Sequence, residues 1–150
     1  MASPASFLKH PIHVILVPFP LGLWTFSFVC DLVNLFGWGG PVWKEVAFYT
    51  MAGGIVGALL AAVPGLIDLL SLSDPRVKRI GIWHMVVNLS AVATFAVDLW
   101  LRKHGPPDAK TPVVLSALGV ILIGVSGWLG GEMVYVHGVA VEAPPAAGRA

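Results

Sequence analysis

Four long stretches without a charged residue restrict what this chain can fold into. They run from Lys9 to Asp31, from Glu45 to Asp68, from Arg79 to Asp98 and from Lys110 to Glu132. Each is close to the roughly 20 apolar residues that a helix needs to cross about 30 Å of hydrocarbon. The pattern therefore predicts four transmembrane helices.

The composition points the same way, because 57% of the residues are hydrophobic, only 11% are charged and the mean hydropathy is +0.83. These values lie far outside those of soluble domains. We expect an all-α fold, an integral membrane four-helix bundle. Residues 1–10 are predicted as an N-terminal segment, 11–137 as the four-transmembrane-helix domain and 138–150 as a disordered C-terminal tail. The helices are expected at about 11–36, 42–70, 77–102 and 112–136, and the first is expected to be retained because no signal cleavage site follows it.

Prolines and small residues give the expected bundle further detail. Pro18, Pro20 and Pro64 fall inside predicted spans, where broken backbone is tolerated chiefly when it is buried in protein or lines a cavity. Small residues recur at helical spacing on the second and fourth spans, which allows close helix packing. These are Gly53, Gly57, Ala61 and Gly65, and then Gly124, Gly127, Gly130 and Gly131.

Polar residues gather at one side of the expected bundle. Because the chain crosses four times, the first and third spans begin on the same side on which the second and fourth spans end. This side is named face A. Face A receives His10, His13, Asp68, His84, Glu132, Tyr135 and His137. Ionisable residues in transmembrane segments are costly and usually mark a functional site in the bundle interior.

The third span carries a stripe of residues at a spacing of three or four, which we expect to face inward. The stripe is His84, Asn88, Ala91, Phe95 and Asp98. At the opposite side, face B, Asp98 and Arg102 have the i, i+4 spacing of a local ion pair. Face B also carries Asp31 and Asn34, and no chemistry is assigned to it.

The face A histidines suggest a metal or haem site. Neutral imidazole is the commonest ligand for transition metals and haem iron. One version is a b-type haem held between His13 and His84, with His10 as the alternative ligand from the first span. Asp68 or Glu132 would accept the second ring N–H of a ligand, and Asn88, Tyr135 and His137 are further second-shell or proton-handling candidates. The other versions are a transition-metal ion held by His10, His13, His84 and a carboxylate, or no cofactor, with the polar groups satisfying one another.

Four ordered motifs resemble a bacterial membrane family known as domain of unknown function 2231. They are His10-Pro11-Ile12-His13 through Gly22, Pro64 through Asp68, His84 with Asn88, and Gly130 through Val139. The resemblance implies a four-helix membrane module of no settled activity. Some relatives are joined to cytochrome c-like or Rieske domains, so the resemblance also implies electron-transfer surroundings. This chain contains no Cys-x-x-Cys-His, which excludes covalently attached haem.

These observations predict a membrane redox module in the bacterial cytoplasmic (inner) membrane that exchanges electrons with a quinone or with other membrane or cytochrome subunits. The alternative is an accessory subunit of a larger membrane complex that binds no redox centre. Either is an electron-transfer or accessory role rather than an enzyme, and a homo-oligomer is compatible with both. Nucleic-acid binding and hydrolase or transferase chemistry find no motif. The basic residues are shared evenly between the two faces, and only the turn at Arg76, Lys78 and Arg79 favours a cytoplasmic face A.

Overall fold

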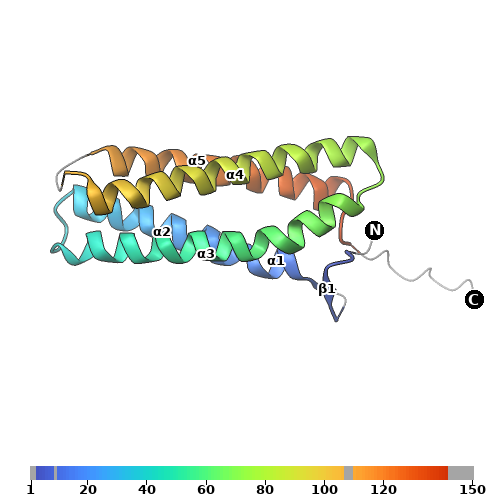
Figure 1. The fold of residues 1–150 in the computed structure, drawn as a ribbon, viewed down its shortest axis with the longest axis horizontal. Coiled ribbons are helices and arrows are strands. Elements are labelled where there is room, and N and C mark those ends of the chain that lie inside the picture. The colour runs from blue at the N-terminus through green and yellow to red at the C-terminus, as the bar shows by residue number, and fades with distance from the viewer. Residues whose placement is uncertain (1–2, 9, 107–109, 142–150) are drawn as a thin grey trace, which may run out of the picture.

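The computed structural model describes residues 3–8, 10–106 and 110–141 as an all-α bundle with a small hairpin at its N-terminal end (Figure 1). The hairpin consists of β1 (Ser6–Phe7) and β2 (His10–Pro11), which pair antiparallel. The helices are α1 (Ile12–Leu16), α2 (Pro18–Leu35), α3 (Val42–Ser71), α4 (Pro75–His104) and α5 (Thr111–Gly131). A π-helical turn, η1 (Glu132–Val136), continues α5. Of the tail expected at 138–150, residues 142–150 lie outside the described part.

Four segments have the length and hydropathy of membrane spans, as the sequence predicts. They are Ile12–Leu35, Val42–Ser71, Pro75–His104 and Thr111–Val136. Their outer surfaces are apolar, with large side chains such as Val63, Leu89 and Ile121 exposed. The multi-pass four-helix membrane fold is therefore confirmed, and lipid is the environment of its outer surface.

The first span differs from the prediction because it is divided at Val17. Pro18 has no N–H to give to a carbonyl four residues earlier. The backbone continues through the bonds from Val17 N to His13 O, at 3.0 Å, and from Leu21 N to Val17 O, at 3.3 Å. His13 consequently lies on a short separate helix, α1.

The helices form two closely packed pairs. The first span packs mainly on α3, and α4 packs mainly on α5, while α3 with α4 and α2 with α5 make fewer contacts. Figure 1 shows the two pairs as layers along the bundle, with the turn from α3 to α4 at the same end as the β1–β2 hairpin. That end corresponds to face A.

The bundle centre is built by side chains from diagonally opposite helices. Trp24 of α2 stacks on Phe95 of α4, with ring centroids 4.4 Å apart. Met51, Ala91 and Ile123 complete the buried cluster. The inward stripe predicted for α4 is confirmed, because its lower members Ala91, Phe95 and Asp98 are buried and its upper members are half-buried.

Glycine allows the close approach of the helices within each pair. A Cβ at Gly54 would lie 2.5 Å from the Trp24 ring, and one at Gly119 would clash with Phe95. The predicted ridge on α3 does face the first span, since Gly53 and Gly57 contact Leu23 and Pro20. Gly124 and Gly127 differ from the prediction, because nothing lies within 4 Å of a Cβ built on either of them.

Candidate functional site

Two of the predicted ligands, His13 and His84, face each other across the centre of the bundle at the face A end. Their ring centroids are 6.2 Å apart and the ring planes are nearly perpendicular, at 84°. His13 comes from α1 and His84 from α4, so each helix pair supplies one ring. Both side chains are half-buried.

Each imidazole is held by a backbone carbonyl of its own helix pair. His13 Nδ1 lies 2.8 Å from the carbonyl oxygen of Ala61, and His84 Nδ1 lies 2.9 Å from that of Ser126. A carbonyl oxygen can only accept, so Nδ1 is the nitrogen that carries the hydrogen in both rings. Nε2 of each neutral ring therefore keeps its lone pair, which is the form that ligates a metal.

Glycines make room for both rings. A Cβ at Gly65 would lie 2.7 Å from His13 Nδ1, and a Cβ at Gly130 would lie 3.3 Å from His84 Cε1. Each of these glycines is four residues after the carbonyl that accepts the histidine hydrogen bond. The two rings are thus held in similar ways, by α3 for His13 and by α5 for His84, except that Ser126 Oγ also lies 3.0 Å from His84 Nδ1.

This likeness extends along the whole bundle as an internal repeat of the two helix pairs. The same separation of 71 residues relates three contacting pairs, His13 with His84, Trp24 with Phe95 and Asp31 with Arg102. On the second helix of each pair, a constant spacing relates Gly54 to Gly119, Ala61 to Ser126 and Gly65 to Gly130. The face-to-face histidines therefore occupy equivalent positions in two similar halves.

The other predicted site residues are not assembled with this pair. His10 is exposed on β2, where its Nδ1 lies 2.8 Å from the carbonyl of Leu8. Asn88 donates to the backbone carbonyl of His84 at 2.9 Å. Tyr135 and His137 are exposed, and Glu132 is half-buried at the start of η1. Asp68 or Glu132 was expected to accept the histidine N–H. In the structure, backbone carbonyls accept it instead.

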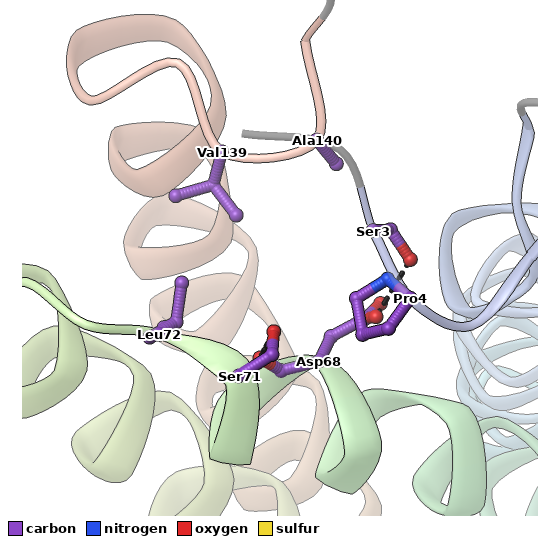
Figure 2. A pocket seen from close by; sticks show the side chains of 7 residues that line it. All are labelled: Ser3, Pro4, Asp68, Ser71, Leu72, Val139 and Ala140. Carbon is purple, nitrogen blue, oxygen red and sulfur yellow. Dashed lines mark hydrogen bonds between the residues drawn. The ribbon is translucent and has the colours of Figure 1, made fainter.

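Asp68 instead closes a pocket at the face A end of the bundle. Its Oδ1 accepts from Ser3 Oγ at 2.6 Å and from the backbone N–H of Ala5 at 3.4 Å. The pocket encloses about 300 Å³, and Figure 2 shows Leu72 and Val139 on one side with Ser3 and Pro4 on the other. The described start of the predicted tail, at Val139 and Ala140, thus lines this pocket.

The separation of the two rings is close to that of two imidazoles that share one metal ion. A metal–nitrogen bond of about 2.0–2.1 Å, with about 1.1 Å from nitrogen to ring centre, places two opposed imidazoles about 6.3 Å apart. Zinc and similar ions take most of their four or more ligands from protein side chains. Within the described residues no group of three or more His, Cys, Asp or Glu side chains is arranged to hold a metal. Haem iron needs only two axial protein ligands.

Face B holds a buried charged network that is larger than the local ion pair predicted from the sequence. The expected pair is present, with Arg102 Nε 3.0 Å from Asp98 Oδ1. Arg102 also binds both oxygens of Asp31, 71 residues away, at 2.7 and 2.6 Å. A comparison of the sequence with itself at that separation would have aligned Asp31 with Arg102 and indicated the contact.

Fold and site together define a multi-pass membrane protein with a pair of histidines opposed across its bundle. The chain belongs to the family described as predicted membrane protein (DUF2231), whose pattern matches residues 9–143. Comparison with curated proteins and with solved structures gives no match.

Proposed function

We propose that this protein is a membrane electron-transfer module that binds one b-type haem between His13 and His84. The observation that carries the proposal is the opposed pair of imidazoles 6.2 Å apart, each with Nδ1–H donated to a backbone carbonyl. When bound, the haem would supply a one-electron centre near the face A end of the bundle. The bacterial cytoplasmic membrane is its proposed location.

The chain's own residues prepare this site in three ways. The carbonyls of Ala61 and Ser126 fix the tautomer and direction of each ring, which raises the basicity of the ligating nitrogen. Gly65 and Gly130 leave room for the rings beside α3 and α5. The Trp24–Phe95 stack closes the bundle below the histidines and keeps water from the centre.

The pocket beside Asp68 lies at the same end of the bundle and is the proposed binding place of an electron partner. A carboxylate and the hydroxyls of Ser3 and Ser71 line it together with apolar side chains. An apolar site with a few polar groups is the usual form of a small-molecule site. A quinone headgroup, or a redox group of another membrane or cytochrome subunit, is the proposed electron partner.

The direct test is a reduced-minus-oxidised absorption spectrum of the detergent-purified protein, with haem and metal analysis on the same sample. We expect the α-band of a six-coordinate b-type haem, at one haem per chain. His13→Ala and His84→Ala should each abolish that spectrum. His10→Ala and His104→Ala, which change exposed histidines, should keep it.

Two controls separate loss of ligand from loss of fold. Each variant should elute as the wild type does on size exclusion and keep its helical circular dichroism. His84→Gly supplied with free imidazole should regain the six-coordinate spectrum. Full haem occupancy in both histidine variants would overturn the proposal.

An accessory subunit is the second candidate, favoured by an apolar groove on the outer surface. The groove encloses about 250 Å³ beside the glycine ridge of α3, between Phe19, Leu23, Val56 and Leu60. Close helix packing in lipid uses such small-residue surfaces. A colourless, metal-free protein that co-purifies with other membrane subunits would establish this role instead of the haem module.

A further inference from the structure

The charged network at the face B end is buried and formed by three helices. Arg102 of α4 binds Asp31 of α2 through two parallel N–H···O bonds of 2.7 and 2.6 Å, and Asp98 through Nε at 3.0 Å and, more weakly, through Nη2 at 3.3 Å. Ser116 of α5 lies 2.8 Å from Asp98 Oδ2 and 3.0 Å from Arg102 Nη2. Asp98 is fully buried, Asp31 is 5% exposed and the Arg102 side chain is 10% exposed.

The network has one carboxylate too many for its single guanidinium. Asp31 and Arg102 neutralise each other across the bundle in an end-on, bidentate pair, the strongest geometry for these groups. Asp98 is the surplus group. In the internal repeat its counterpart on α2 is Ser27, which is neutral and donates to the carbonyl of Ala47 at 2.8 Å.

The charged and titratable groups nearby supply no second buried cation. Lys44 and Glu45 at the start of α3, Lys103 and His104 at the end of α4, and Lys110 before α5 are all exposed. Cys30, next to Asp31 on α2, is buried and carries no positive charge. The described part of the chain thus leaves the network with a formal charge of −1 when both carboxyls are ionised.

A net charge inside a membrane bundle is costly, and a buried carboxyl avoids the cost by taking a proton. We propose that Asp98 is a proton-binding site, occupied at neutral pH and filled from the face B side of the membrane. The face B side is the side assigned because the network lies at that end of the bundle, where the Arg102 side chain retains some exposure.

Ser116 is the residue that accommodates the proton. With Asp98 ionised, the Ser116 hydroxyl donates to Oδ2. With Asp98 protonated, the carboxyl O–H donates to Ser116 Oγ across the same 2.8 Å separation. The Ser116 hydroxyl then rotates its own hydrogen away from Asp98 while Oγ still accepts from Arg102 Nη2, and Asp31 keeps its two bonds to Arg102 in both states. The site binds a proton without breaking the ion pair that joins the helix pairs.

The test is infrared spectroscopy of the full-length protein in lipid nanodiscs, in the C=O stretching region of protonated carboxyl groups. Wild type at neutral pH should show such a band, shifted in D₂O and lost as the pH is raised. Asp98→Asn should remove the band, and Asp98→Ser, which installs the residue found at position 27, should do the same. Asp68→Asn and Glu132→Gln are the controls, and both should keep it.

Asp31→Asn tests whether Asp98 holds its proton because the network has an excess carboxylate or only because Asp98 is buried. That variant leaves one carboxylate for one guanidinium, so Asp98 should ionise and the band should disappear although Asp98 is still present. Absence of the band from wild type at neutral pH, or its survival in Asp98→Asn, would overturn the proposal. A band that persists in Asp31→Asn would contradict the claim that the excess of carboxylates over guanidinium groups causes Asp98 to bind a proton. None of these three outcomes depends on haem being bound.

Discussion

At the scale of single residues, the most informative feature is that backbone carbonyls hold both central histidines. A carboxylate in the same place would titrate and would draw the shared proton toward itself. The carbonyls of Ala61 and Ser126 do neither, so the ligating tautomer of His13 and His84 is fixed at any pH at which the rings are neutral.

Gly65→Ala tests whether the space beside Gly65 is needed to orient the His13 ring. The new Cβ would lie 2.7 Å from His13 Nδ1, so the ring must turn away from the Ala61 carbonyl. Loss of such an orienting contact typically weakens metal binding by about 10–100-fold. We expect haem affinity in a haem titration of the apoprotein to fall by about that factor. Gly124→Ala, with open space at its Cβ, should bind as wild type does, and equal affinities in the two variants would contradict this role for Gly65.

The angle between the rings makes a second prediction. The imidazole planes are 84° apart, and nearly perpendicular axial ligands leave the iron d-orbitals almost degenerate. Electron paramagnetic resonance of the oxidised protein should therefore show the highly anisotropic low-spin signal of perpendicular ligands. A rhombic signal, as parallel imidazoles give, would mean that the rings rotate when haem binds.

Sequence reasoning singled out His13 and His84 because an ionisable residue within an apolar span is rare and costly, and the structure places the two rings 6.2 Å apart. It could not identify their hydrogen-bond partners, because every residue offers a carbonyl and only the packing decides which one is reached. It also grouped His10 with His13 from their three-residue spacing. The structure separates them, because the helix begins only at Ile12 and His10 belongs to the preceding hairpin.

At the scale of elements, the spans were predicted to within a few residues because hydrophobic length fixes them. The break at Val17 follows from Pro18, one of the prolines noted inside the predicted spans. Two local features were not predicted. The π-helical turn at Glu132–Val136 depends on how the backbone packs, and the β1–β2 hairpin has only two residues in each strand. The internal repeat was not predicted either, because only a few widely spaced positions show it. The sequence separation between equivalent residues also differs between the first and the second helices of the pairs, because the connections differ in length.

The repeat predicts that Asp31 and Arg102 can be exchanged. Breaking a buried ion pair by changing one partner costs about 3–5 kcal/mol. Asp31→Arg and Arg102→Asp alone should each lower the folded yield and the thermal midpoint in detergent strongly. The double variant re-forms the pair with its charges reversed, so we expect it to recover much of both. A double variant no better than the worse single one would show that the positions are not equivalent.

At the scale of the whole molecule, three contacts between diagonally opposite helices follow one another along the bundle. The histidine pair lies at face A, the Trp24–Phe95 stack in the middle and the Asp31–Arg102 pair at face B. The direct contacts between the two helix pairs are otherwise fewer than those within each pair. This central line of contacts helps to hold the halves in register, and of its three pairs only Asp31 and Arg102 are joined by hydrogen bonds.

Haem binding should complete that line and stabilise the fold. A ligand that binds only the folded state adds about 4 kcal/mol when its concentration is about 1,000 times its Kd. We expect the haem-loaded protein to unfold at a clearly higher temperature than the apoprotein, followed by circular dichroism in the same detergent. His84→Ala should show no such increase on adding haem, whereas His104→Ala should show the full increase. An apoprotein as stable as the loaded form would mean that the two helix pairs do not depend on a ligand bridging His13 and His84.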